Sequence, residues 1–211
     1  LAFELSYKLV AITCNDNTFL EPAGGNGSFI DALSSLGAKN IEAVDLYPKH
    51  ASVLEADFLS YEPKGRNLVT VSNPPFGRNN SLSIPFFNHA AEHSDYVAFL
   101  VPRSWRKWSV QNRLDRRFHL ISDQDVAVNY VTDSGVQIGA NNDLRTCFQI
   151  WEKRTDLRPK LKVEDQGLVS KCAPEDADIA IRVFGFGCGK VYREFPRAAN
   201  TTLMFLTVSD A

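Results

Sequence analysis

A run of four residues, Asn73-Pro74-Pro75-Phe76, combines groups that can act on a flat ring carrying an amino group. The preceding segment 67–71 is apolar and β-branched, which predicts a buried strand that ends at this run. Two adjacent prolines stop the strand but leave their carbonyls as acceptors in a stiff loop. Asn73 and the Pro74 carbonyl can both accept from one exocyclic amine, and Phe76 offers a ring face to a base. For these four residues alone, a proline-rich turn is the plain alternative.

A glycine-rich turn lies upstream, between a predicted strand over 18–21 and a predicted helix. Glycines allow a sharp reversal and a close approach of a ligand to the backbone. We expect Ser28 to cap the helix and Gly37 to end it. A Gly-x-Gly pattern alone is a weak signal, and the lack of Gly-Lys-Ser/Thr argues against a phosphate-binding ATPase loop. The candidate ligand-binding residues here are Glu21, Pro22, Ala23, Gly24, Gly25 and Gly27.

Two acidic residues follow at the ends of later predicted strands. Asp45 ends the strand over 41–46, about twenty residues beyond the glycines, which is the spacing of a carboxylate that grips ribose hydroxyls. The same carboxylate would repel a 2′-phosphate, and a solvated strand-end Asp is the ordinary alternative. Leu46 is expected to pack on an adenine face. The segment 51–59 predicts a strand ending in Asp57-Phe58, for which a loop cap and a core aromatic are the alternatives.

In their order and spacing, these segments resemble the class I, S-adenosylmethionine-dependent methyltransferases that act on adenine N6, over about residues 1–155. The resemblance implies S-adenosylmethionine as the cofactor, with Asp57 accepting from its adenine amino group, Phe58 packing nearby and Asn73 also in contact. It implies a Rossmann-like α/β fold with a mostly parallel seven-stranded sheet and helices on both faces. Residues 156–211 would form a small β-rich extension.

The segment 103–117 gathers six basic residues and two tryptophans in a chain whose formal net charge is −2. Cations neutralise phosphates and indoles stack on bases, so this segment is the best candidate for a nucleic-acid contact. A solvated helix face with the tryptophans turned inward is the alternative. Its Pro-Arg-Ser-Trp start also resembles bacterial and phage adenine methyltransferases. The residues expected to contact nucleic acid are Arg78, Arg103, Trp105, Arg106, Lys107, Trp108 and Arg113.

The remaining patterns predict the other elements of such a fold. We expect a mobile polar loop over 77–83 and a linker over 154–162. The glycine-punctuated stretch 180–191 predicts a β-rich module for target recognition, and the sequence leaves open whether it is complete at Ala211. Helices are expected over 3–10 and 84–93, and strands over 96–102, 124–131 and 144–153.

The composition is that of an ordinary globular protein, with 211 residues and 44% hydrophobic content. The four cysteines form no Cys-x-x-Cys pair, so we expect free thiols and no bound metal. No apolar run reaches membrane-spanning length and no signal-peptide pattern is present, which favours no membrane association and a cytoplasmic setting in a bacterium or phage-infected host.

The predicted activity is methyl transfer from S-adenosylmethionine to the N6 amine of adenine in DNA. Asn rather than Ser at position 73 favours adenine over cytosine. RNA and protein glutamine amides stay open as substrates, as does a non-catalytic methyltransferase-like subunit that binds nucleic acid or a catalytic partner. A nicotinamide-dependent oxidoreductase would leave the double proline without a role. A restriction or partner subunit is an open possibility, and the oligomeric state is not indicated.

Overall fold

The computed structural model describes residues 1–128 and 145–209. Its contacts divide the chain into two units, Leu1–Leu161 and Lys162–Ala211. The sequence predicts a boundary at residue 155, whereas in the structure residues 156–161 belong to the first unit. Arg158 is only 9% exposed, and its guanidinium donates to the carbonyls of Phe118 at 3.1 Å and Gln111 at 2.8 Å. These bonds hold the segment against the first unit.

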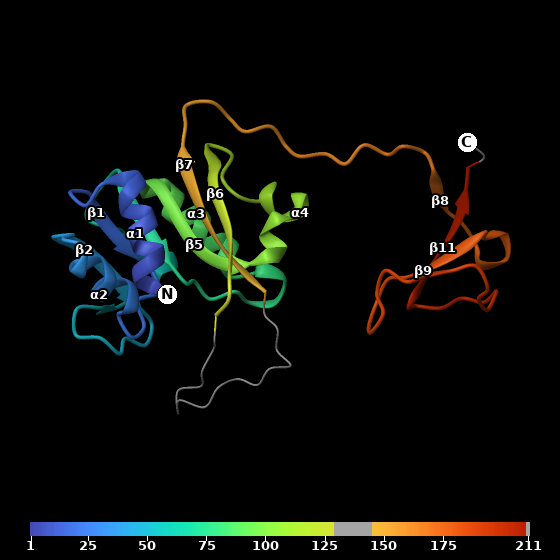
Figure 1. The fold of residues 1–211 in the computed structure, drawn as a ribbon, viewed down its shortest axis with the longest axis horizontal. Helices are drawn as coiled ribbons and strands as arrows, with labels where there is room; N and C mark the ends of the chain where they lie inside the picture. The colour runs from blue at the N-terminus through green and yellow to red at the C-terminus, as the bar shows by residue number, and fades with distance from the viewer. Residues whose placement is uncertain (129–144, 210–211) are drawn as a thin grey trace. The chain divides into compact units, whose positions relative to one another are not determined.

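The first unit is built on a seven-stranded sheet in the order β3-β2-β1-β4-β5-β7-β6 (Figure 1). Strands β1 to β5 run parallel, and β7 pairs antiparallel with both β5 and β6. The predicted mostly parallel sheet is confirmed. The strands are β1 Thr18–Glu21, β2 Asn40–Asp45, β3 Leu54–Glu55, β4 Leu68–Ser72, β5 Ser94–Pro102, β6 Phe118–Val126 and β7 Thr146–Lys153.

Helices cover both faces of this sheet. On one face α1 and α2 pack against Phe19, and on the other α3 packs against Leu20, because successive strand residues point to opposite faces. Each face therefore has its own hydrophobic cluster. The helices are α1 Ala2–Thr13, α2 Ser28–Ser35, α3 Ser83–His93 and α4 Trp108–Gln111, with 3₁₀ turns η1 Phe58–Ser60, η2 Arg78–Asn80 and η3 Arg103–Arg106.

Some element boundaries differ from the sequence prediction. The strand expected over 51–59 is only Leu54–Glu55, and the strand expected over 124–131 begins already at Phe118. Residues 129–144, including the predicted turns there, lie outside the described residues. Ser28 is the first residue of α2 rather than its cap, which is Gly27 with φ 82°. The helix ends as expected before Gly37, whose φ is +91°.

The second unit is β-rich, as the sequence indicated, and forms an antiparallel sheet in the order β10-β9-β11-β8. The stretch 180–191 is not one strand, because Gly185, Gly187 and Gly189 adopt positive φ and turn the chain between β9 and β10. Its small core includes Ala180 and Phe205. The elements are β8 Val169–Lys171, η4 Pro174–Asp176, β9 Ile179–Arg182, β10 Val191–Tyr192 and β11 Leu203–Val208.

The cysteines Cys14, Cys147, Cys172 and Cys188 are free thiols. Within residues 1–128 and 145–209, none of the helices has both the length and the apolar character needed to cross a lipid bilayer.

Candidate active site

The order of the strands brings three predicted segments to one edge of the sheet. Strand β1 lies between β2 and β4, and the chain builds β2 and β3 on one side of β1 before it crosses to β4 and β5. Loops that leave the carboxyl ends of parallel strands diverge at such a switch point, which is where open α/β sheets bind ligands. The glycine turn follows β1, Asp45 ends β2, and Asn73 follows β4.

The glycine turn after β1 is held close to β2. The Gly24 amide donates to the Val44 carbonyl at 3.0 Å, and the Gly27 amide donates to the Gly24 carbonyl at 2.7 Å. Gly27 has φ +82°, and an added Cβ would lie 2.4 Å from Cδ2 of His50. A side chain at position 27 would therefore displace His50 and strain the backbone. The turn needs glycine here for its shape.

Asp45 contacts the glycine turn directly. One carboxylate oxygen accepts from the Gly25 amide at 2.8 Å, and the other accepts from the Tyr47 amide at 2.8 Å. Each oxygen has a second lone pair, so both can still accept from a ligand hydroxyl. Beyond Asp45, Leu46 is 52% exposed and Tyr47 is 80% exposed. The strand end thus presents an acceptor with apolar surface beside it.

Glu21 lies inside the protein and joins the glycine turn to strand β4. It is 2% exposed, and its Oε1 accepts from the Ala23 amide at 3.0 Å and the Ser72 hydroxyl at 2.5 Å. Burial raises the pKa of Glu21 to about 8, although both hydrogen bonds act to lower it. We expected Glu21 to contact the cofactor. In the structure Glu21 is buried and holds the hydroxyl of Ser72, the residue before Asn73, and Pro22 beside it is also buried.

The Asn-Pro-Pro-Phe segment forms the loop that leaves β4. Asn73 and Pro75 are exposed, Pro74 is buried, and Phe76 is partly exposed. The Phe76 carbonyl accepts from the Leu82 amide at 3.3 Å, which closes the loop onto the start of α3. Since proline fixes φ, the position of Asn73 is set by Ser72 on one side and by Pro74 on the other.

The segment that follows, which we expected to be a mobile polar loop, is folded into η2. Gly77 has φ +65°, and an added Cβ would lie 2.5 Å from the Ser81 hydroxyl. Asn80 is 6% exposed and donates to the Ser104 hydroxyl at 3.2 Å. This bond ties the loop after β4 to η3, the turn that follows β5.

Sequence comparisons find partial relatives among methyltransferases. No family model matches the chain. Over 83 residues it is 31% identical to the Type II methyltransferase M.HincII of Haemophilus influenzae, a match covering 37% of this chain and 16% of that protein. The match to M.HindII has the same extent. The chain therefore spans about one sixth of the length of these relatives.

Solved structures match over most of the chain. PH1948 of Pyrococcus horikoshii, a proposed RNA methyltransferase, matches with a TM-score of 0.58 and 16% identity over 72% of this chain and 83% of that one. The structure of lmo1582 of Listeria monocytogenes, a proposed class I S-adenosylmethionine-dependent methyltransferase, matches with a TM-score of 0.52 and 17% identity. The match covers 77% of this chain and 62% of that one. A modification subunit of a proposed type I restriction enzyme from Vibrio vulnificus matches with a TM-score of 0.50 and 15% identity. The match covers 72% of this chain and 44% of that one. The chain has the class I methyltransferase fold.

The methyltransferase fold implies S-adenosylmethionine as the cofactor, and the residues at this edge fit it. In the glycine turn Gly25 is partly exposed, whereas Gly24 and Gly27 are buried and shape the turn. Asp45 offers carboxylate oxygens suited to ribose hydroxyls, and Leu46 and Tyr47 offer apolar surface suited to a base. We therefore expect Gly24, Gly25, Gly27, Asp45 and Leu46 to hold the cofactor.

The Asp57-Phe58 pair departs from its prediction. Asp57 is exposed and caps η1, with one oxygen accepting from the Leu59 amide at 3.0 Å. The ring of Phe58 is 1% exposed and lies 5.1 Å from the ring of Phe86. Phe58 therefore belongs to the core of this methyltransferase fold, and its ring is not available to a ligand. Asp57 remains a candidate cofactor contact.

The basic segment 103–117 is partly neutralised by acids of the edge strand β6. Arg103 lies 2.6 Å from Asp125, and Arg106 contacts Asp123 at 2.7 Å and Asp125 at 2.8 Å. The hydrogen bond to Asp123 raises the pKa of Arg106 above its usual range. By contrast, the described structure exposes three further candidate contacts with nucleic acid, Arg78, Lys107 and Arg113.

The two tryptophans of this segment face opposite ways. Trp105 is fully buried, and its indole NH donates to the Ser83 hydroxyl at 3.2 Å. Its ring packs edge-on against Phe87. The expectation that Trp105 stacks on a base is therefore wrong, because the fold needs this indole in the core. Trp108 is 51% exposed and remains available.

Sequence reasoning missed the residues that hold the loops together. Ser72 is the clearest case, and a signal existed, since it is a polar residue that ends a mostly apolar strand immediately before Asn73. The Asn80–Ser104 bond gave no local signal, because its partners are 24 residues apart.

Proposed function

We propose that this chain transfers a methyl group from S-adenosylmethionine to the exocyclic N6 amine of adenine in DNA. The observation that carries the proposal is the exposed Asn73 on a proline-stiffened loop beside the glycine turn, joined to it through Ser72 and Glu21. The similarity to Type II methyltransferases and to the modification subunit of a restriction enzyme supports DNA as the substrate. A restriction subunit is accordingly a candidate partner.

The chemistry asked of the chain is to make a poor nucleophile attack. The lone pair of the adenine amine is delocalised into the ring. If the Asn73 side-chain oxygen and the Pro74 carbonyl accept both amine hydrogens, the nitrogen becomes tetrahedral and its lone pair localises. Fixed acceptors stabilise the positive charge that develops on this nitrogen without reorganising. When bound, S-adenosylmethionine supplies an electrophilic methyl group.

Phe76 and the turn around it would hold the target base. A partly exposed ring beside Asn73 can stack on adenine, which must be extruded if the substrate is duplex DNA. Holding the amine in line for attack supplies much of the remaining acceleration. Pro75 contributes by stiffening the loop that carries both groups.

Contacts with the nucleic-acid backbone fall to exposed cations near this loop. Arg78 belongs to η2, directly after the Asn-Pro-Pro-Phe segment, while Lys107 and Trp108 follow η3, to which η2 is tied by the Asn80–Ser104 bond. We assign phosphate contacts to Arg78, Lys107 and Arg113, and stacking to Trp108.

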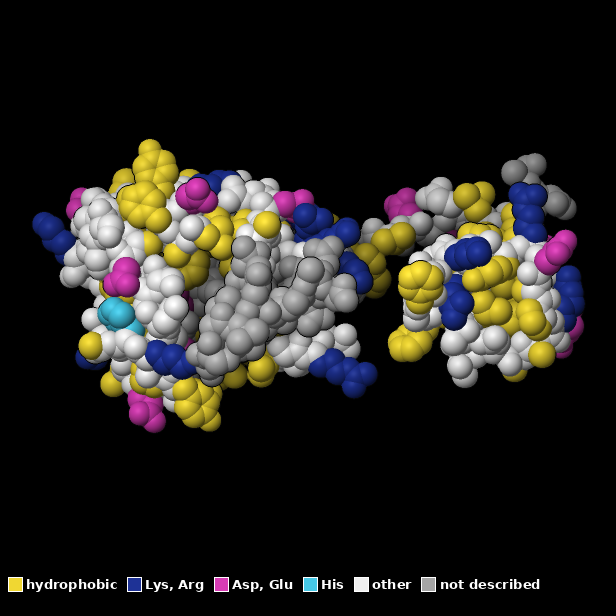
Figure 2. Space-filling view, turned by 60° about the horizontal axis from the view of Figure 1, so that its bottom comes forward, with side chains coloured by type: hydrophobic (Ala, Val, Ile, Leu, Met, Phe, Trp, Pro, Cys, Tyr) yellow, Lys and Arg dark blue, Asp and Glu magenta, His cyan; other side chains and the backbone are white. Residues whose placement is uncertain are grey.

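The second unit offers a further surface for target recognition. In Figure 2, basic side chains border exposed hydrophobic side chains on this unit. The turn between β9 and β10 presents Phe184, 72% exposed, and Phe186, 99% exposed. Arg182 and Lys190 flank this turn. Aromatic rings beside cations are the pairing that suits nucleic-acid contact.

The test is transfer of labelled methyl from S-adenosylmethionine to matched DNA and RNA pools, followed by mass spectrometry of the nucleosides. N6-methyldeoxyadenosine is the expected product. N6-methyladenosine found only in RNA would keep the mechanism and overturn the substrate. Tight cofactor binding without transfer to either pool would overturn the activity and favour a non-catalytic subunit or a protein substrate.

Two variants separate turnover from cofactor binding. Asn73→Ala should lower kcat about 100-fold or more, since one fixed acceptor in the transition state is lost, and should leave the cofactor Kd nearly unchanged. Asp45→Ala should instead raise the cofactor Kd about tenfold or more, because hydrogen bonds to a charged group are lost. The controls are Asn40→Ala and Asp16→Ala, both exposed and away from the carboxyl edge. Comparable turnover by Asn73→Ala would refute its role.

A further inference from the structure

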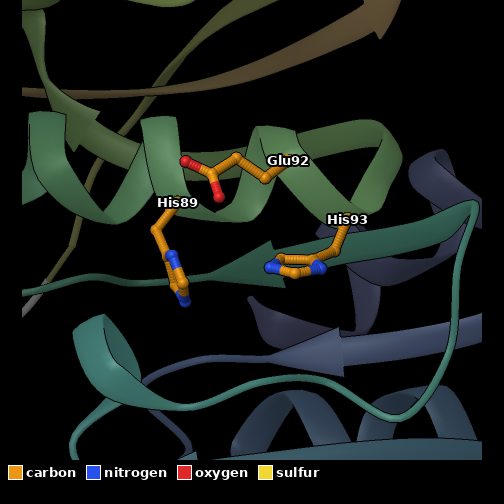
Figure 3. A group of neighbouring side chains, drawn as sticks. All are labelled: His89, Glu92 and His93. Atoms are coloured by element: carbon orange, nitrogen blue, oxygen red, sulfur yellow. The ribbon is translucent and has the colours of Figure 1, made fainter.

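The last turn of helix α3 gathers three side chains that bind metals. His89, Glu92 and His93 stand at helix positions i, i+3 and i+4, which place side chains on neighbouring parts of one face. One ligand atom from each lies within 4.8 Å of the others. Figure 3 shows both imidazoles on the same side of the helix, with the ring of His93 directed toward His89.

The hydrogen bonding of His89 leaves one ring nitrogen ready to bind an ion. Its Nε2 lies 2.8 Å from the carbonyl oxygen of Tyr61. A carbonyl only accepts, so Nε2 carries the proton, and the Nδ1 of the neutral ring keeps its lone pair. Metal-bound histidines commonly donate their other ring NH to a backbone carbonyl in this way.

His93 supplies the second, independent observation. Its side chain is 4% exposed, and its buried Nε2 has no hydrogen-bond partner. An unpartnered polar atom in a protein interior is costly and calls for an explanation.

The groups around His93 include both signs of charge. The carboxylate of Glu62 lies 3.8 Å from Nε2, and the exposed Glu92 lies in the cluster itself. Opposing them, the Arg66 guanidinium lies 3.4 Å from Nδ1 of His93. An arginine can only donate, so this contact requires an unprotonated Nδ1, and the proton of the neutral ring is then on Nε2. When a metal binds Nε2, the proton moves to Nδ1 and the contact with Arg66 is lost.

We propose that His89, Glu92 and His93 form a binding site for a divalent transition-metal ion of the zinc class, with Glu62 as a further oxygen ligand. Imidazole with carboxylate is a donor set that suits Zn²⁺, whereas Mg²⁺ prefers oxygen ligands alone. The ion would link the end of α3 to the segment 61–66 through shared ligands.

The site lies at the amino ends of the parallel strands, and Asn73 lies at their carboxyl ends. His93 immediately precedes β5, and Arg66 lies just before β4, so the cluster sits at the amino ends of strands whose carboxyl ends carry the methyl-transfer loops. Its role is therefore in stability, and it does not depend on the proposed activity.

The experiment titrates Zn²⁺ into the untagged chain of residues 1–211 by calorimetry, with Co²⁺ as a spectroscopic replacement and Mg²⁺ as a negative control. The background carries Cys14→Ser and Cys188→Ser, because these two exposed thiols would also bind zinc. We expect one ion per chain. At a hundredfold excess over Kd, Zn²⁺ should raise Tm by about 5 °C or more.

The decisive variants are His89→Gln and Glu92→Gln, since neither side chain is buried. Each should weaken Zn²⁺ binding about tenfold or more. Arg66→Gln should tighten it, because an opposing charge and a competing donor are removed. The matched controls are His50→Gln and His119→Gln, each a histidine near a single aspartate, at 3.4 Å and 3.6 Å. These two control variants should bind Zn²⁺ with the same affinity as the parent chain.

Two results would overturn the proposal. One is the absence of saturable one-to-one binding by the parent chain. The other is equal affinity in the parent and in His89→Gln, which would place the ion elsewhere.

Discussion

The loops at the carboxyl ends of the strands and the basic segment 103–117 differ in whether their polar side chains are exposed or already paired within the fold. At the carboxyl edge the backbone is fixed by prolines, glycines and buried Glu21, while Asn73 is exposed. In the basic segment, Arg106 is bound by Asp123 and Asp125, and Trp105 fills the core. Side chains that the fold leaves unused are the better candidates for function. By that criterion Trp108 and Lys107 outrank Trp105 and Arg106.

The largest expected effect separates the two tryptophans. Trp105→Ala removes a fully buried indole and should lower the free energy of unfolding by about 3–5 kcal/mol. Trp108→Ala, at an exposed position, should change stability by less than about 0.5 kcal/mol while weakening single-stranded DNA binding by about 1–3 kcal/mol. Urea unfolding and fluorescence anisotropy measure the two quantities. Equal stability losses would show that both rings serve the core.

A smaller effect on stability is expected from Glu21, which is buried at the base of the loops, whereas Asn73 is exposed. The folded protein holds a proton on Glu21 that the unfolded chain releases above its ordinary pKa of 4.5. The stability that this proton contributes is complete below pH 4.5 and is lost as pH rises through about 8. Glu21→Gln has no such proton, so the parent should lose stability relative to the variant between these limits.

Urea unfolding at several pH values tests this expectation, with Glu4→Gln, an exposed position on α1, as the control. A constant difference between the parent and Glu21→Gln from pH 5 to 9 would contradict the raised pKa. Glutamine keeps an oxygen that can accept from the Ser72 hydroxyl, so the loop geometry should be retained.

The smallest effect concerns two adjacent cations. Lys107→Gln should reduce the slope of log affinity for DNA against log salt concentration by about 1, as expected for one lost phosphate contact. Arg106→Gln should reduce it less, because Asp123 and Asp125 already balance its charge. Reversed magnitudes would mean that DNA displaces the acids from Arg106.

Local patterns predicted much of the fold and the framework of the site. The glycine turn, Asp45 and the Asn-Pro-Pro-Phe segment each carry their signal within a few residues, and the sheet places them at one edge. The predicted class I fold is confirmed. The roles of these residues in binding and catalysis stay predictions.

What the sequence could not provide is the direction in which an aromatic or acidic side chain points. Phe58 and Trp105 are core residues because α3 packs over them, and α3 is distant in sequence from both contacts. Glu21 became a buried link because its partner Ser72 is 51 residues away. The sequence led us to expect no bound metal, and only the structure shows that the Nε2 atom of His93 has no hydrogen-bond partner.

The acids that hold Arg103 and Arg106 also have a consequence for solubility. Strand β6 ends the sheet, so one row of its backbone groups could pair with a strand of another molecule. Asp123 and Asp125 alternate along this strand with their carboxylates at the surface, and charges on an edge strand oppose such pairing. The opposite edge, β3, is only two residues long. Replacing both aspartates to release the arginines would therefore expose an unprotected edge and promote aggregation.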